Sequence, residues 1–493
     1  MSARRDDEPR SPLPGWWPWL AIALGALTLR LWGLDARSLW LDEVVSLEVA
    51  RAPLAAILRG EAFDNHTPPL YYVLLKAWLL LAPATELGLR LPSALLDAAN
   101  ALLLGLLCMR ALGAGIATGR TAALVYALSP YAIRLAQEAR MYPLLMTCAL
   151  VAWGATLRYV AERRPGDLVV AALAATAGLY THYFFAPFLA VLYGWAAVVL
   201  YRQRRTPWPW LVQTLAVALA FLAWLPVVLD LLGSGQSFRR YSLAVLPYAL
   251  VRFASGYGAL RLHWRERQSL LDGVLAHWAL ITIVLVVVTP LLLAALVVAW
   301  RRSNATRSLV WLMAGVPLLA LVTDRLAPSL SERYLAAVFP SFVALLALLP
   351  WGSRGPRGWV ALQVLATTLL LCSLVAHLLR PAAGTERWDD AAAAIEAAMP
   401  EEAPILVSPG FYRDVAVYHL PQRRIIGLKA LRDCKLPSAL GRQYPNQATG
   451  AFGLLEVEAM SWVARQLADC GYRVERGGHW SDGNGLLFHT VGH

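Results

Sequence analysis

The chain has 493 residues, of which 58% are hydrophobic and 15% charged, and its mean hydropathy is +0.51. This composition excludes an ordinary soluble globular protein and predicts an α-helical polytopic membrane protein. The net charge of +12 does not indicate nucleic acid as a partner, because the basic residues are spread through short connections and form no single patch.

The first strongly apolar segment runs from Trp16 to Leu34. Arg4 and Arg5 precede it, but no small-residue cleavage pattern follows it, so we expect a retained membrane helix and not a removable signal peptide. The amino terminus is then expected on the cytoplasmic side.

Further apolar segments predict, with the first, about eleven membrane-spanning helices. They lie at residues 91–110, 120–136, 142–160, 167–181, 184–201, 209–231, 274–300, 308–323, 334–350 and 358–380. Arginines occupy every second connection, which the positive-inside rule places in the cytoplasm. The remaining connections, including the segments 35–90 and 232–273, are predicted to face outward.

The apolar stretch from Pro68 to Leu81 is too short for the ~20 residues that a spanning helix needs. We expect a juxtamembrane or re-entrant helix there, on the outer face. With an odd number of crossings, the carboxyl terminus is also expected outside.

Composition changes near residue 385, so residues 1–384 are predicted to form the membrane domain and 385–493 a small soluble α/β domain. An Ala-rich helix is expected after Trp388, and strands at 405–407 and 424–426. Cys434 and Cys470 fall in this region, where an extracytoplasmic location would permit a disulfide. Cys108, Cys148 and Cys372 lie singly in apolar spans and are interpreted as small buried hydrophobes.

Five polar clusters lie at the predicted outer ends of the apolar spans. They are Asp42-Glu43, Asn65-His66-Thr67, Gln137-Glu138-Ala139-Arg140-Met141-Tyr142, Thr181-His182-Tyr183 and Ser331-Glu332-Arg333-Tyr334. Ionisable groups at a membrane boundary are commonly functional, and this placement predicts that the clusters meet at one surface. The sequence contains no Gly-rich phosphate loop, no HExxH and no GxSxG, so nucleotide-dependent chemistry has no evident location.

These residues together resemble a known family. Asp42-Glu43, His66-Thr67-Pro68-Pro69-Leu70-Tyr71-Tyr72, Glu86 to Leu95, Ser129-Pro130, Gln137 to Tyr142 and Tyr180 to Tyr183 occur in the order found in glycosyltransferase family 39. More widely, residues of about 15–350 resemble the GT-C superfamily of membrane glycosyltransferases, which includes aminoarabinose transferases and Rgt-like enzymes.

The resemblance implies a GT-C fold and transfer of a sugar, with inversion, from a polyprenyl-phosphate carrier to an acceptor hydroxyl or phosphate. The acceptor would be a glycolipid, a polysaccharide or a protein. The resemblance also implies a location in a bacterial inner membrane, with the active site and the C-terminal domain outside the cytoplasm. A lipid-linked donor agrees with the lack of a nucleotide motif, because sugar nucleotides are cytoplasmic.

The resemblance also implies roles for individual residues. Asp42 matches the family's catalytic acid and would act as the general base. Glu43 would orient the acceptor or, with Asp42, help to bind a divalent cation, which is the one cofactor the family suggests. Donor and phosphate contacts are assigned to His182, Arg333, Tyr334, Tyr71 and Tyr72, and substrate positioning to His66, Glu138, Arg140 and Tyr142.

Each of these positions also has a structural interpretation. Arg333 would be an interfacial side chain, His182 an interface anchor, and Glu138 with Arg140 a local ion pair. The tyrosines would belong to the interfacial aromatic belt, and Arg90 is interpreted as structural. As a titratable group, His182 would make phosphate binding depend on pH.

Two other functions stay open at this point. A lipid or solute transporter, or flippase, would place polar residues near the middle of the membrane and show repeat symmetry. A non-catalytic sensor or assembly factor would function fully after Asp42→Asn.

Overall fold

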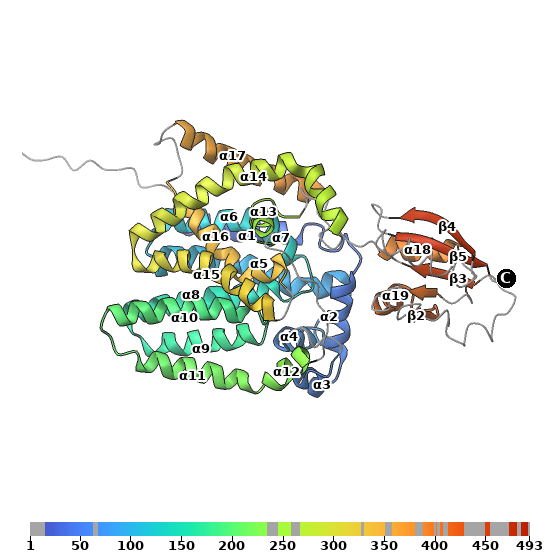
Figure 1. Cartoon of the computed structure of the whole chain (residues 1–493), viewed down its shortest axis with the longest axis horizontal. Helices are drawn as coiled ribbons and strands as arrows, with labels where there is room; N and C mark the ends of the chain where they lie inside the picture. The colour runs from blue at the N-terminus through green and yellow to red at the C-terminus, as the bar shows by residue number, and fades with distance from the viewer. Residues whose placement is uncertain are drawn as a thin grey trace, which may run out of the picture.

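A computed structural model describes residues 15–62, 68–233, 245–257, 267–326, 330–350, 357–379, 388–398, 401, 405–407, 413–427, 449–453, 473–480 and 485–491. Helices form one large body, and the C-terminal elements lie beside it next to α2 (Figure 1). Sites predicted at His66, Cys434 and Cys470 lie outside the described residues.

The first half of the helical body alternates long apolar helices with short ones. Its elements are α1 (Trp17–Leu31), α2 (Leu41–Arg51), α3 (Leu54–Arg59), α4 (Leu70–Trp78), α5 (Glu86–Leu106), the π-helical turn η1 (Leu107–Ala111), α6 (Ile116–Leu128), α7 (Pro130–Ala136), α8 (Tyr142–Glu162), α9 (Pro165–Leu179) and α10 (Phe185–Arg202).

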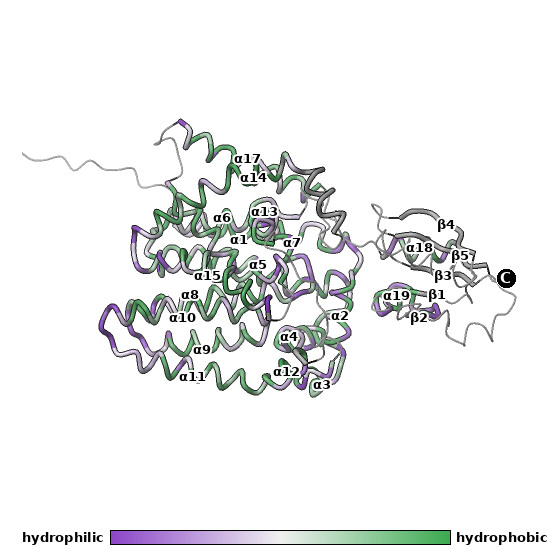
Figure 2. Tube along the Cα trace, viewed as in Figure 1, coloured by the Kyte–Doolittle hydropathy of each residue, from purple (hydrophilic) through white to green (hydrophobic). Residues whose placement is uncertain are grey.

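The second half completes the body. Its elements are α11 (Trp208–Leu222), α12 (Leu225–Gly233), α13 (Val245–Ser255), α14 (Arg267–Arg302), α15 (Asn304–Leu326), the 3₁₀ helix η2 (Glu332–Val338), α16 (Phe339–Ala347) and α17 (Arg357–Leu379). Figure 2 shows that most of these helices are apolar along their length.

Within the described residues, six helices are long and apolar enough to cross a membrane, or seven if α11 and α12, bent by 59°, form one span. Every predicted span contains at least one helix. However, α1, α6 and α9 are shorter than a full span, and the predicted tenth span begins as η2 before the nine-residue α16. The number of crossings and their orientation stay predictions.

The predicted helix at 120–136 is wrong in one respect, because the chain breaks it into α6 and α7 at Ser129-Pro130. A residue before proline avoids the helical conformation, and Ser129 is extended with φ −68° and ψ 119°. Its hydroxyl then caps α7 by accepting from the Ala132 amide at 3.4 Å. The break turns α7 toward the residues of the next cluster.

The segment 232–273 is likewise not one continuous loop. It contains α13, and α14 begins at Arg267.

The prediction of a short helix in residues 68–81 is confirmed, because α4 has nine residues and is too short to span a membrane. α4 is tied to its neighbours by the Leu70 amide, which donates to the Tyr180 carbonyl at 2.9 Å, and by Lys76, which donates to the Ala52 carbonyl at 2.9 Å.

Close packing joins α1, α5 and α6. A Cβ atom on Gly105 would lie 2.8 Å from the Gly119 carbonyl oxygen, so only glycine permits this approach of α5 to α6. Arg30 and Asp97, both fully buried, form an ion pair of 2.8 Å between α1 and α5. A charge inside an apolar span requires a partner, but the sequence did not indicate which residue pairs with Arg30.

The C-terminal elements are α18 (Trp388–Ala398), β1 (Ile405–Val407), α19 (Arg413–His419), β2 (Ile425–Gly427), β3 (Thr449–Gly453), β4 (Arg473–Trp480) and β5 (Gly485–Val491). β1 and β2 pair in parallel, and β3, β5 and β4 form an antiparallel sheet in that order. The strands predicted at 405–407 and 424–426 are therefore present within one residue. A separate domain over residues 385–493 stays a prediction.

Candidate active site

Asp42 and Glu43 occupy the first turn of α2, where the helix dipole favours carboxylates. They differ sharply in accessibility: the Asp42 side chain is 31% exposed, whereas that of Glu43 is 1% exposed. Of the two adjacent acids, Asp42 is therefore the one that a substrate can reach.

Glu43 is held by the guanidinium group of Arg90, which donates from Nε and Nη2 to its two oxygens at 2.7 Å each. The Ala139 amide also donates to Glu43 Oε1, at 2.9 Å. Arg90 further donates to the carbonyls of Leu34 and Arg37, at 2.8 Å each. This network favours a structural part for both residues, since the carboxylate of Glu43 is already satisfied.

Arg140 lies against Asp42. Its Nε is 4.0 Å from Asp42 Oδ2, and its Nη1 donates to the Asp42 carbonyl at 3.1 Å and to Ser46 Oγ at 3.2 Å. The Ser93 hydroxyl in turn donates to the Arg140 carbonyl at 3.1 Å. Arg140 therefore brings a positive charge close to the exposed carboxylate of Asp42.

Glu138 pairs with two arginines, both from outside its immediate loop. Its carboxylate is fully buried and lies 3.2 Å from Arg134 Nη2 and 3.4 Å from Arg333 Nη1. The guanidinium group of Arg333 also lies over the rings of Trp40 and Tyr257, at 5.1 Å and 5.5 Å from their centroids. Arg333 is thus held in place while its side chain stays 21% exposed.

His182 lies in the tight turn between α9 and α10. Its ring centroid is 4.7 Å from that of Tyr334 and 6.2 Å from that of Tyr142. Nδ1 accepts from the Phe184 amide at 3.1 Å, so the proton of the neutral ring is on Nε2. A Cβ on Gly178 would lie 2.4 Å from the Phe185 ring, which explains a glycine at the start of this turn.

Burial, with a smaller effect from the Arg140 charge, lowers the pKa of His182 to about 3. The ring is therefore neutral at physiological pH. A dependence of phosphate binding on pH through His182 stays a prediction.

The low pKa predicts a pH effect on stability. Between pH ~6.5 and ~3 the unfolded chain binds a proton at His182 that the folded chain does not, so folding is weakened as the pH falls through this range, by about 1.4 kcal/mol per pH unit. In detergent, the thermal midpoint of the wild type should fall further between pH 7 and pH 5 than that of His182→Asn, which retains an acceptor for the Phe184 amide. Other titrating groups are common to both proteins, so equal falls would contradict the prediction.

Tyr71 and Tyr72 lie on the inner face of α4, 5% and 1% exposed. Burial raises the pKa of Tyr71, and the charges of Arg140, Glu43 and Glu138 also act on its phenol, which places it beside the carboxylate and arginine cluster. Neither ring is exposed, as a tyrosine of an interfacial aromatic belt would be. Donor contact by Tyr71 and Tyr72 stays a prediction.

Several residues of this arrangement were not predicted. Arg134 and Glu138 are four residues apart, a spacing at which side chains of one helix meet, so the sequence did carry a signal for that pair. No pattern in the sequence indicated Arg252 and Tyr257. In the structure the Arg252 guanidinium lies 4.6 Å from the centroid of the Tyr257 ring, and the Tyr257 hydroxyl donates to Glu332 Oε1 at 3.2 Å. Within the described residues no group of three metal-ligating side chains is present.

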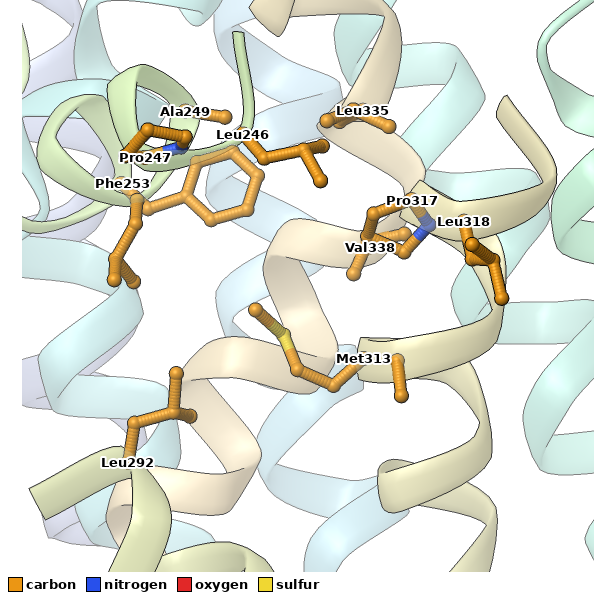
Figure 3. A pocket seen from close by; sticks show the side chains of 12 residues that line it. Leu246, Pro247, Ala249, Phe253, Leu292, Met313, Pro317, Leu318, Leu335 and Val338 are labelled. Carbon is orange, nitrogen blue, oxygen red and sulfur yellow. The ribbon is translucent and has the colours of Figure 1, made fainter. Parts of the chain in front are cut away.

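An apolar cavity of about 500 Å³ lies between α13, α14, α15 and η2. Its lining includes Leu246 and Phe253 of α13, Met313 of α15, and Leu335 and Val338 of η2, and Figure 3 shows these side chains around the open space. The same short elements, α13 and η2, carry Arg252 and Arg333. The two arginines lie over the ring of Tyr257.

Comparison with known proteins agrees with this architecture. Residues 66–226 match the family described as dolichyl-phosphate-mannose-protein mannosyltransferase. Among solved structures, the chain is similar to ArnT from Cupriavidus metallidurans in the apo state, with a TM-score of 0.51 and 16% identity over 97% of this chain and 99% of ArnT. A comparison with curated proteins gives no match. At 16% identity this similarity shows that the chain has the fold of ArnT.

Two further structures have lower similarity. ArnT bound to undecaprenyl phosphate gives a TM-score of 0.47 at 16% identity, covering 97% of this chain and 99% of ArnT. The archaeal oligosaccharyltransferase AglB from Archaeoglobus fulgidus, in complex with an inhibitory peptide and a dolichol-phosphate, gives 0.49 at 14% identity, covering 97% of this chain and 74% of AglB.

Proposed function

We propose that this chain is a GT-C glycosyltransferase that moves a sugar from a polyprenyl-phosphate carrier to a hydroxyl or phosphate acceptor at the outer face of the membrane, with inversion. The observation that carries the proposal is the contrast between the acids of the cluster. Asp42 is 31% exposed beside Arg140, whereas Glu43 and Glu138 are buried and held by arginines. The family match over 66–226, whose description names a dolichyl-phosphate sugar donor, supports the donor class.

In the proposed reaction Asp42 accepts the proton of the acceptor hydroxyl as its oxygen attacks the anomeric carbon. The bond between that carbon and the phosphate oxygen breaks, and its electron pair leaves with the polyprenyl phosphate. Attack opposite the leaving group inverts the anomeric centre. A phosphate acceptor that is already ionised needs no proton removal, and Asp42 would then only orient it.

The leaving phosphate gains negative charge and needs fixed donors. Arg333 is suited to this part because Trp40, Tyr257 and Glu138 hold its guanidinium while a fifth of the side chain stays exposed. The neutral ring of His182 offers Nε2–H as a second donor. We propose that the apolar cavity between α13, α14, α15 and η2, the helix that carries Arg333, holds the start of the prenyl chain.

The remaining predicted residues then act as support. Glu138 and Glu43 fix Arg333 and Arg90, and Arg140 lies beside Asp42 and helps to position it. Tyr334 and Tyr142 hold the His182 ring. A cation held by Asp42 and Glu43 would compete with Arg90 for the Glu43 oxygens, so we propose a reaction in which arginines carry the positive charge.

Arg333→Gln is expected to lower kcat/KM for the lipid-linked donor on the order of 10- to 100-fold, the equivalent of the 1.5–3 kcal/mol typical of a hydrogen bond to a charged group. Arg333→Lys should recover only part of this loss, because an ammonium group cannot use the planar fork. Steady-state transfer kinetics check this, with Arg325→Gln at an exposed position of α15 as the control. Equal kinetics for the two Gln variants would contradict it.

The proposed function is tested by supplying purified protein in nanodiscs with radiolabelled sugars on synthetic polyprenyl phosphates and with the corresponding sugar nucleotides, in the presence of total membrane acceptors. We expect label in the acceptor fraction from the lipid-linked donors alone. Transfer from the nucleotides, or from neither class of donor, would contradict the proposal.

A further inference from the structure

The backbone just before the candidate base is held from two sides. On one side, Arg90 of α5 donates to the carbonyls of Leu34, Arg37 and Ser38, at 2.8, 2.8 and 3.1 Å. On the other side the contacts come from residues more than 300 positions away in the sequence, in α18 and α19. Figure 1 shows these two helices at the side of the body where α2 lies.

Two hydrogen bonds join the C-terminal helices to this backbone. The Trp388 amide, at the start of α18, donates to Ser38 Oγ at 3.1 Å. His419, the last residue of α19, lies 2.9 Å from the Leu39 carbonyl through Nε2, and because a carbonyl only accepts, Nε2 carries the proton. Leu39 is three residues before Asp42, and α2 begins at Leu41.

The His419 ring is itself fixed. It lies parallel to the Trp388 indole, with an interplanar angle of 9° and 6.2 Å between centroids, and Trp388 is 2% exposed. Burial lowers the pKa of His419, so the ring is neutral and keeps a single N–H for Leu39. A ring with one orientation and one donor fixes the position of the carbonyl that it binds.

We propose that His419 is a positioning residue for Asp42, through which the C-terminal helices set the backbone from Ser38 to Leu41 and hence the first turn of α2. The inference rests on the proposed function of Asp42 as the general base. On this proposal α18 and α19 affect the rate of the reaction by holding the backbone before Asp42, whether or not they contact the acceptor. A displacement of about 1 Å in a catalytic group can cost on the order of 100-fold in rate.

The test compares His419→Ala, His419→Gln and Ser38→Ala with Val417→Ala, an exposed position on the same helix, all as full-length protein in nanodiscs. His419→Ala is expected to lower kcat on the order of 10-fold or more, with the donor KM changed less than about 2-fold, because Asp42 and not the donor contacts is displaced. His419→Gln, whose amide can donate to Leu39, should recover most of kcat. Ser38→Ala should show a smaller loss, and Val417→Ala none.

Amide hydrogen exchange gives a readout that needs no substrate. His419→Ala should increase exchange in a peptide covering residues 38–43 and leave exchange in α5 unchanged, whereas Val417→Ala should change neither. Unchanged exchange at 38–43 in His419→Ala, or a kcat equal to that of Val417→Ala, would overturn the proposal. So would equal losses in the Ala and Gln variants. If the wild type transfers no sugar, the proposed function fails, and the exchange measurement still decides whether His419 positions this backbone.

Discussion

Asp42→Asn is expected to lower sugar transfer by on the order of 10²- to 10⁴-fold, the usual contribution of a positioned general base. The amide occupies the same volume and can keep the backbone contacts of α2, but it cannot accept the acceptor's proton at neutral pH. The loss should therefore appear in kcat, with little change in the donor KM. Steady-state and single-turnover transfer assays separate these quantities.

Glu48→Gln is the matched control for this variant. Glu48 lies on the same helix, six residues further on, and its side chain is 45% exposed in a surface ion pair with Arg51. Its neutralisation should leave transfer unchanged. Transfer at the wild-type rate by Asp42→Asn would remove Asp42 as the base and return Glu138 and Glu43 to consideration.

Arg90→Met is expected to destabilise the protein by about 3–5 kcal/mol, the cost of leaving a buried carboxylate without its partner. Glu43 would lose both charged hydrogen bonds, and three carbonyls before α2 would lose their donor. Arg90→Lys should be intermediate, because one ammonium group cannot reach all of these acceptors. Thermal unfolding in detergent checks the order of the three proteins.

Arg51→Met provides the comparison. Its ion pair with Glu48 is 2.9 Å long, like a buried pair, but the two side chains are 54% and 45% exposed, and such pairs contribute about 0–1 kcal/mol. A midpoint for Arg90→Met equal to that of Arg51→Met would show that the Glu43 network does not hold α2 in place.

Much of the site's location could be predicted from the sequence. Charged residues in an apolar chain cannot face lipid, so the clusters at the outer ends of the spans had to meet one another. The structure brings Asp42 to Arg140, Glu138 to Arg333 and His182 to Tyr334. The roles assigned to these side chains stay predictions.

The choice of partner within the cluster could not be predicted. Glu138 and Arg140 are two residues apart, yet the Glu138 carboxylate pairs with Arg134, one helical turn before it, and with Arg333, almost 200 positions later. Pairing depends on the break at Ser129-Pro130, where α7 begins, and on the position of η2, which carries Arg333. Hydrophobic periodicity reports which face of a helix is apolar but not which neighbouring helix that face meets.

The contact of α19 with the backbone before α2 illustrates the same limit. Nothing in the sequence near His419 indicates Leu39 as its partner, because the two are 380 positions apart and the contact involves a backbone carbonyl. The short strands β1 and β2, by contrast, follow from local runs of Ile, Leu and Val.

The central claim is that the chain transfers a sugar and does not merely bind or translocate a lipid. The most direct test follows both products of one reaction in nanodiscs, where no second compartment exists: sugar on the acceptor and polyprenyl phosphate without sugar. We expect the two products to appear in equal amounts with the wild type and neither to appear with Asp42→Asn. Donor that remains intact in the presence of acceptor, or carrier released without sugar on an acceptor, would contradict it.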